Sequence, residues 1–147
     1  MTFRRASYGD ISRIADLLEP FYAKSGKPYC IPFDRPSAEA TVRQVIHQGY
    51  CLVGQASCAG AIPVPFPFNR NVIIAYVIFW HAKRGRELTI FDALCRECAA
   101  RGATLVNSSS LFPANTIGRL YERRGHWPVE TQFLGLAKQP ERDTNPS

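Results

Sequence analysis

The sequence has no apolar run long enough to cross a membrane. Its longest such run, Val72 to Trp80, has nine residues, whereas a transmembrane helix needs about 20. The first residues, Met1 to Tyr8, carry a basic pair but no apolar stretch behind it, so they do not read as a secretory signal. Both absences predict a protein of the cytoplasm.

The cysteines are too irregularly spaced in the sequence to predict a disulfide framework. The five cysteines are an odd number at uneven spacing, which fits a reducing compartment. Cys95 and Cys98 have the spacing of some metal and redox sites. They fall on the apolar face of an expected helix, however, and no second pair or nearby histidine completes four ligands. We therefore expect buried thiols that act as small hydrophobic side chains, and no metal.

Domain linkers and internal repeats are also missing. The chain has 147 residues, 46% of them apolar and 20% charged, which indicates one globular domain over residues 1–137. Residues 138–147 are polar and contain proline, so we expect a flexible tail. The net charge of +6 comes from scattered basic residues, and no zinc-finger, RNA-binding or helix-turn-helix signature accompanies them. Nucleic acid is thus an unlikely partner, and the charge equally suits an anionic cofactor.

Hydrophobic periodicity predicts alternating strands and helices. The expected elements are a strand at Phe3–Ala6, a helix opened by Asp10, a second helix capped by Ser37 and closed by Gly49, a hairpin of Tyr50–Val53 and Cys58–Ile62, a strand at Val72–Trp80 buried on both faces, a helix at Leu88–Ala100, a strand at Thr104–Asn107, a helix at Thr116–Arg124 and a last strand or strand pair at Trp127–Ala137. Their order predicts an α/β (α+β) fold, a mixed sheet of six or seven strands flanked by about four helices.

Three prolines alternate with apolar residues after the hairpin. Backbone N–H groups two residues apart point to the same edge of a strand, so Pro63, Pro65 and Pro67 leave one edge without donors. We therefore expect the third strand to end near Ile62 or to continue only as an unpaired edge. The apolar residues of the resulting stiff arm are Val64, Phe66 and Phe68.

Two segments, together with the order of elements, carry a resemblance to a known family. They are the turn Arg84-Gly85-Arg86-Glu87-Leu88-Thr89 and the segment Leu120-Tyr121-Glu122-Arg123-Arg124-Gly125-His126-Trp127. Over about residues 2–137 the chain resembles the GNAT superfamily of N-acetyltransferases, most closely the short ones of bacteria and their phages. The resemblance implies a transferase, an acyltransferase that moves an acetyl group from acetyl-CoA to an amine on a protein or small molecule. It would act in the host cytoplasm if a phage encodes it.

The first segment corresponds to the turn that holds the coenzyme A pyrophosphate in that family. Backbone N–H groups and the positive end of a helix dipole favour an anion there. Arg84 matches the family's Gln/Arg, but Glu87 and Thr89 stand where the family has two glycines. A basic turn that merely starts a helix is the alternative. The cofactor-binding residues that the resemblance implies are Phe79, His81, Arg84, Gly85, Arg86, Glu87, Leu88, Thr89 and Asn115.

The second segment contains the family's catalytic tyrosine. Tyr121 and Gly125 match its pattern, with Asn115 displaced by one place and Trp127 one place beyond the usual aromatic residue. The resemblance implies that Tyr121 protonates the leaving thiolate of coenzyme A. An ordinary half-buried aromatic residue is the alternative for Tyr121.

A general base is harder to identify. GNAT enzymes often carry a glutamate on the central strand, and its place falls near Ile74, but no carboxylate lies between Val72 and Trp80. His81 is the titratable group nearby that works near neutral pH. It is our candidate base, and a polar residue that ends a strand is the alternative.

These departures leave a second function open. The altered turn and the missing carboxylate also fit a GNAT-fold module that has lost catalysis and binds a partner protein. Its contact surfaces would be the aromatic segment Tyr29–Phe33 and the proline arm Pro63–Phe68.

Overall fold

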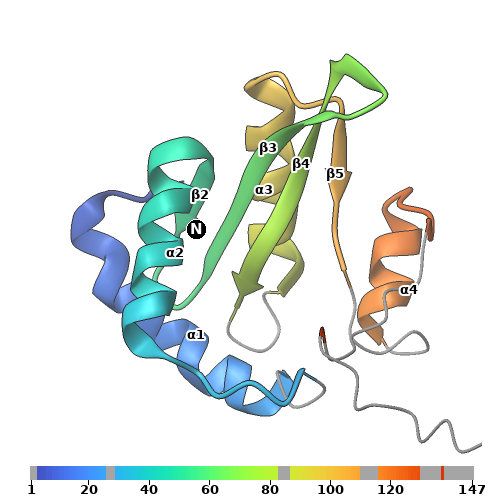
Figure 1. The fold of residues 1–147 in the computed structure, drawn as a ribbon. Helices are drawn as coiled ribbons and strands as arrows, with labels where there is room; N and C mark the ends of the chain where they lie inside the picture. The colour runs from blue at the N-terminus through green and yellow to red at the C-terminus, as the bar shows by residue number, and fades with distance from the viewer. Residues whose placement is uncertain (1–2, 26–28, 83–86, 110–115, 130–136, 138–147) are drawn as a thin grey trace, which may run out of the picture.

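The computed structural model describes residues 3–25, 29–82, 87–109, 116–129 and 137 (Figure 1). Its elements are β1 (Arg4–Arg5), the 3₁₀ helix η1 (Tyr8–Asp10), α1 (Ile11–Ser25), α2 (Arg35–Gln48), β2 (Tyr50–Val53), β3 (Cys58–Phe66), β4 (Asn69–His81), α3 (Glu87–Ala100), β5 (Leu105–Asn107) and α4 (Thr116–Arg123). The expected order is confirmed as far as α4. The last strand expected at Trp127–Ala137 lies mostly outside the described residues, and so does the tail 138–147.

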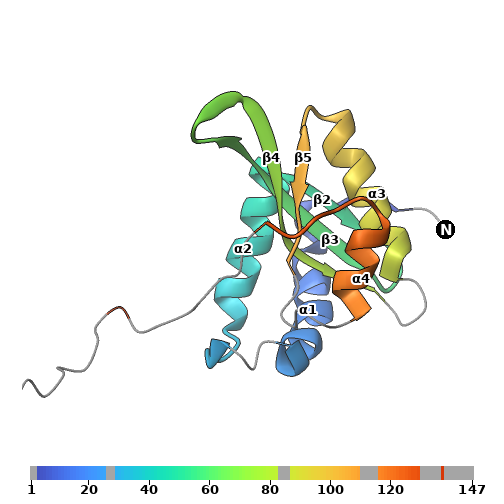
Figure 2. The ribbon, with the colours of Figure 1, turned by 90° about the vertical axis from the view of Figure 1, so that its right-hand side faces the viewer.

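The strands form one mixed sheet in the order β1-β2-β3-β4-β5. All neighbours are antiparallel except β4 and β5, which are parallel. Helices α1 and α2 cover one face, α3 covers the other, and α4 lies beyond β5 (Figures 1 and 2). The α/β prediction is confirmed, with five strands in the described residues where six or seven were expected. No helix among the described residues is long and apolar enough to span a membrane.

Each face of the sheet has its own core. On the face of α3, Ile90, Leu94 and Cys98 pack against alternate residues of β2 and β3, and on the other face Ile14, Val42 and Val45 do the same. Burial raises the pKa of the Cys98 thiol to about 12, and Cys95 is half-buried with its pKa raised to about 11. Both thiols therefore stay protonated near neutral pH, as expected of cysteines that serve as packing residues.

Of the two outcomes predicted for the third strand, an end near Ile62 is wrong, whereas continuation with an unpaired edge is confirmed for the edge on the side of β2 in the described residues. β3 does not stop near Ile62 but runs to Phe66, paired with β4 throughout. An antiparallel ladder needs donors only from every second residue, and Pro63 and Pro65 occupy the alternate positions. Their missing donors fall on the other edge, which β2 does not cover because its pairing with β3 ends at Tyr50.

The predicted cap of α2 is also wrong. The cap is Asp34 rather than Ser37, because the Asp34 carboxylate accepts from the Ser37 backbone N–H at 3.0 Å. Pro36 then falls in the first turn, where a proline costs no hydrogen bond. Gly49 closes the helix as expected.

A buried carboxylate fixes the chain between β1 and α1, and it predicts a pH-dependent stability. Asp10 accepts from the Arg4 guanidinium at 2.7 and 2.8 Å and from the Ser7 backbone N–H at 2.8 Å. The hydrogen bond from Arg4, helped by those from Ser7 and opposed by burial, holds the pKa of Asp10 well below its usual range. Asp10→Asn should cost about 1–3 kcal/mol of unfolding free energy at neutral pH.

The sign of the pH effect follows from that lowered pKa. The carboxylate's contribution is complete above the unfolded pKa of about 3.9 and is lost as the pH falls through the folded pKa. Urea unfolding at pH 7 and pH 2.5 should therefore show a difference between wild type and Asp10→Asn that shrinks in acid. Asp16→Asn is the control, since Asp16 is 66% exposed. A difference independent of pH would contradict this account.

Candidate active site

The strands β4 and β5 separate beside α4. Their parallel pairing covers only Ile74–Tyr76 against Leu105–Asn107, while β4 continues to His81. Among the described residues, β5 gives β4 no partner beyond Tyr76. The two strands diverge toward the end of β4 in Figure 1, with α4 on the far side of the gap. Backbone groups of β4 beyond Tyr76 thus lie outside the described ladder with β5.

A β-bulge in β4 sets which way the last side chains of the strand point. Gly60 pairs with Phe79 and Ala61 with Val77, so Ile78 is the extra residue. As a result Phe79 packs against the core under α1 and α2, and Trp80 packs against the core under α3. Without the bulge the alternation would reverse, and Trp80 would face α1.

The prediction that β4 is buried on both faces is wrong. Within Asn69–His81 only Ala75 is buried, and Ile78 is 45% exposed. The core under α1 and α2 takes its buried strand residues from β2 and β3, and β4 contributes to it only the partly buried Phe79. A strand that helices cover only in part can have the same apolar sequence pattern as a strand that helices cover on both faces.

Glycine is required opposite the bulge. A Cβ on Gly60 would lie 2.7 Å from Cζ of Phe79 and 2.7 Å from Cγ1 of Val45. A larger residue at position 60 would therefore have to displace the ring of Phe79 and the side chain of Val45.

Tyr121 is buried, with its hydroxyl fully engaged. The phenol oxygen accepts from Nε1 of Trp80 at 3.0 Å and donates to the backbone oxygen of Ser109 at 3.1 Å. Burial raises the pKa of Tyr121, although the Trp80 hydrogen bond acts against the rise. The phenol is therefore protonated at neutral pH, which a general acid must be.

Aromatic rings hold this hydroxyl in place. The ring of Phe91 lies between those of Trp80 (5.5 Å between centroids) and Tyr121 (5.2 Å). His126 stacks on Tyr121 at 5.9 Å, and its Nδ1 lies 3.3 Å from Oγ of Ser108. We call Trp80, Phe91, Tyr121 and His126 the aromatic cluster. It joins β4, α3 and the end of α4.

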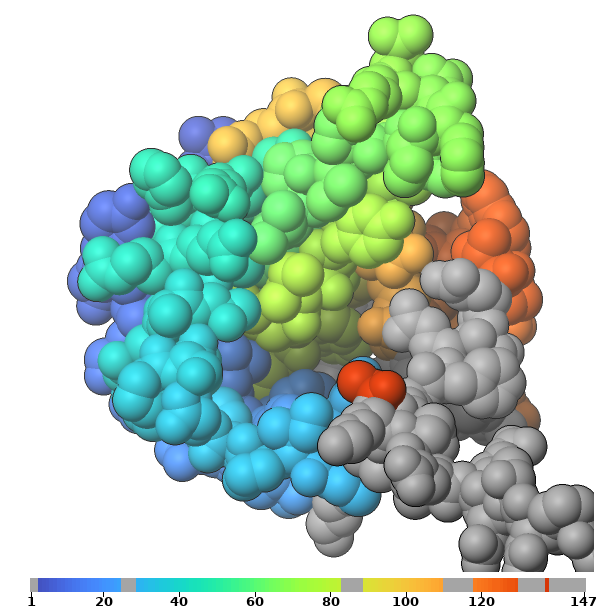
Figure 3. Space-filling view, in the orientation of Figure 1, coloured from blue at the N-terminus to red at the C-terminus, as the bar shows by residue number. Residues whose placement is uncertain are grey.

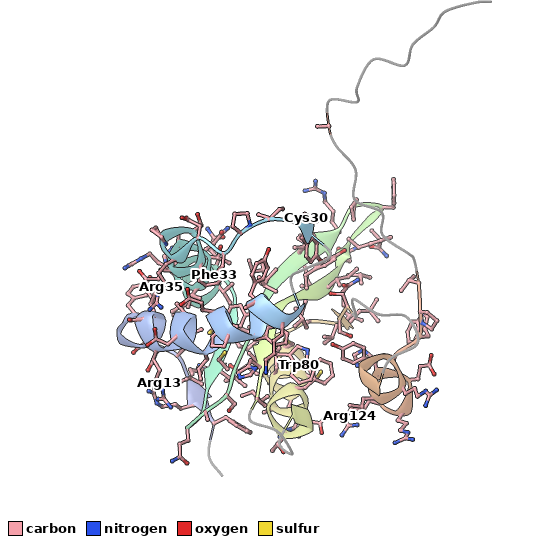
Figure 4. All side chains as sticks on the ribbon, turned by 90° about the horizontal axis from the view of Figure 1, so that it is seen from below. Arg13, Cys30, Phe33, Arg35, Trp80 and Arg124 are labelled. Carbon is pink, nitrogen blue, oxygen red and sulfur yellow. The ribbon has the colours of Figure 1, made fainter. Side chains whose placement is uncertain are left out.

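The other catalytic candidate, His81, lies on the opposite face of the sheet from Tyr121. Its ring contacts Phe21 of α1 at 5.5 Å, on the side to which Phe79 also points. Burial lowers the pKa of His81, so the imidazole is neutral and able to accept a proton at physiological pH. In Figure 4, Trp80 lies toward α3 and α4, whereas Phe33 and Cys30 lie on the side of α1 and α2.

Most of the predicted pyrophosphate turn lies outside the described residues. This applies to Arg84, Gly85 and Arg86, and Asn115 of the second segment also lies outside the described residues. Helix α3 begins at Glu87, and Thr89 in its first turn is exposed. The start of a helix therefore follows β4 closely in the chain, as the resemblance requires.

An open cleft of about 260 Å³ lies between α3 and the end of α4. Its lining residues are Phe91, Asp92, Cys95, Arg96, Arg124 and His126. Asp92 and Arg124 form an ion pair of 2.7 Å that ties the two helices together. Because Phe91 and His126 belong to both, this cleft borders the aromatic cluster.

Comparison with solved structures places the fold among acetyltransferases. A possible acetyltransferase from Clostridium difficile 630 is 12% identical with a TM-score of 0.69, covering 95% of this chain and 98% of its own. A predicted acetyltransferase from Clostridium acetobutylicum, solved with acetyl-CoA, is 16% identical with a TM-score of 0.68, covering 92% of this chain and 94% of its own. A ribosomal-protein-alanine N-acetyltransferase from Brucella melitensis biovar Abortus 2308 is 16% identical with a TM-score of 0.67 and coverages of 92% and 99%.

Neither a protein-family model nor a curated protein matches the sequence. Identities of this size show the fold alone, and the chain shares its fold with these acetyltransferases over nearly its whole length.

Proposed function

We propose that this protein is an N-acetyltransferase that takes its acetyl group from acetyl-CoA and transfers it to an amine on a small molecule or protein. The observation that carries the proposal is the end of β4 beyond Tyr76, which lies outside the described ladder with β5 and whose Trp80 side chain donates to the buried hydroxyl of Tyr121. A parallel pair that opens beside a protonated phenol offers free backbone donors and an acid together.

The residues present fit the acyl donor. Backbone N–H groups of β4 beyond its ladder with β5 suit a thioester carbonyl, and the start of α3 with the cations Arg84 and Arg86 suits a pyrophosphate. The amine nitrogen bonds to the acetyl carbon while the carbon–sulfur bond breaks. The phenolic proton of Tyr121 passes to sulfur, and the nitrogen gives up its proton to His81 or to water.

The acceptor would approach from the face of β4 opposite α3. Figure 3 shows this face as a hollow with β4 at its floor and α1 and α2 along one side. The exposed ring of Phe21 and the neutral His81 lie at this side of the strand. A base on one face and an acid on the other suit an amine that attacks from the first and a thiolate that leaves on the second.

Binding of the acyl donor is the direct test. At about 100 times its Kd, a ligand adds about 2.7 kcal/mol of stability. At about 2–4 °C per kcal/mol for a domain of this size, acetyl-CoA should raise the Tm by about 5–11 °C in a thermal melt.

ATP at the same concentration is the control polyanion, and its shift should be much smaller because it lacks the pantetheine thioester that the proposed site would bind. No shift with millimolar acetyl-CoA and no heat in calorimetry would end the proposal.

A partner-binding module remains the second candidate, because an apolar arm is exposed. Val64 is 38%, Phe66 39% and Phe68 92% exposed at the far end of the β3–β4 hairpin. The segment Tyr29–Phe33 is held against α1 by a 2.7 Å hydrogen bond from Tyr22 to the Ile31 oxygen, and it leaves Ile31 58% exposed. Ordered apolar side chains in water favour a binding role for these two segments.

A further inference from the structure

Trp80 holds the hydroxyl of Tyr121 in one orientation. An indole N–H can only donate, so the 3.0 Å contact with the phenol oxygen fixes that oxygen as the acceptor. The phenolic proton must then point elsewhere, and it points to the backbone oxygen of Ser109 at 3.1 Å. The side chain of Ser108 also hydrogen-bonds the phenol and, like Trp80, acts to lower its pKa.

Three features of the chain bring Trp80 to this place. The bulge at Ile78 turns its side chain toward α3. Its ring then packs against Phe91, which also contacts Tyr121. The half-buried indole would lose a partner for its N–H if the phenol oxygen were absent.

We propose that Trp80 is the positioning residue for proton transfer by Tyr121. Its indole N–H aims the phenol and stabilises the phenolate that remains when the proton passes to the leaving sulfur. This rests on the proposed acetyl transfer. In that step the sulfur takes the place of the Ser109 oxygen as proton acceptor. The phenolate then takes a proton from solvent as the product leaves. This proton balances the one that the amine has released.

The physical basis of this stabilisation is that a hydrogen bond to a charged acceptor is stronger than one to a neutral acceptor. A hydrogen bond gains strength when its acceptor becomes an anion, so the Trp80 N–H favours phenolate over phenol. Burial acts in the other direction and raises the pKa of Tyr121. Trp80, with a smaller contribution from Ser108, therefore offsets part of the cost that burial places on proton release.

The first test measures that offset without any turnover. A fluorinated tyrosine placed at position 121 ionises nearer neutral pH, and its fluorine resonance follows the ionisation directly. Trp80→Phe keeps an aromatic ring but removes the N–H, and should raise the pKa of this phenol by about one unit, a tenfold change in its ionisation constant.

The control is the other tryptophan of the chain. Trp127 is 66% exposed, and Trp127→Phe should leave the phenol's pKa where it is in the parent protein. Equal pKa values in Trp80→Phe and Trp127→Phe would overturn the proposal, whether or not the protein turns over acetyl-CoA.

The second test asks whether the offset matters in catalysis. Trp80→Phe should lower kcat about 10-fold or more with little change in the KM for acetyl-CoA, and should move the alkaline limb of the kcat profile upward. A KM change alone, with kcat and its pH profile intact, would show that Trp80 only packs the site. If wild type fails to bind acetyl-CoA, the proposed function falls, and the fluorine titration still decides whether Trp80 controls the phenol.

Discussion

Tyr121→Phe is expected to lower the rate of acetyl transfer by about 10²–10⁴-fold, the usual contribution of a general acid. The substitution keeps the ring that packs on Phe91 and His126 and removes only the proton donor. Affinity for acetyl-CoA should change little, because the hydroxyl acts on the leaving sulfur only as the bond breaks. Release of free thiol with a panel of amines, or slow hydrolysis of acetyl-CoA, provides the measurement.

Stability has to be followed in the same variant. Loss of the hydroxyl leaves Nε1 of Trp80 without its acceptor and frees the Ser109 oxygen, at a cost of about 1–3 kcal/mol. Assays should therefore run well below the midpoint of thermal unfolding, where the variant is still folded.

The result also separates the two candidate functions. Tyr121 lies in the aromatic cluster, away from the exposed arm that ends in Phe68. A partner protein that binds this arm should be captured equally by wild type and Tyr121→Phe. Equal capture together with no turnover in wild type would favour the binding module.

The sequence predicted the order of elements because its signals there are local. Apolar spacing along α1 and α3, the turn at residues 54–57 and the closing Gly49 each act within a few residues of their own position. The same holds for Tyr121, whose motif spacing placed it on α4.

Other features depend on partners that are distant in the chain. The bulge at Ile78 is visible only once β3 pairs with β4, so the strand pattern alone could not show that Trp80 faces Tyr121. Pro63 and Pro65 lack backbone N–H donors, as expected. Whether that loss breaks the sheet depends on where β2 ends, because β2 does not pair with this part of β3. The sequence signal for Trp80 was present, since a lone tryptophan near the end of an apolar strand needs a partner for its N–H when buried.

The residues of the candidate site lie on both faces of the sheet. Residues of β4 alternate between the face that carries Phe79 and His81 and the face that carries Trp80. One strand therefore supplies contacts to both the acceptor side and the leaving-group side of the proposed reaction. This explains why a single extra residue in β4 changes which groups can take part.

Phe91→Ala is expected to destabilise the fold by about 3–5 kcal/mol, the range for loss of a buried aromatic side chain. Phe91 is 1% exposed and lies between Trp80, Tyr121 and His126, so its removal opens a cavity inside the aromatic cluster. The Tm should fall by about 6–20 °C at 2–4 °C per kcal/mol.

Phe68→Ala is the matched control, because the same atoms are removed from a ring that is 92% exposed. Its unfolding free energy should stay within about 0.5 kcal/mol of wild type. Equal losses in the two variants would show that the cluster around Phe91 is not packed as described. If only Phe91→Ala is destabilised, the same variant should also release the Trp80 indole. Exchange of that N–H with solvent deuterium should then be faster, because the ring that holds Trp80 against Tyr121 is gone.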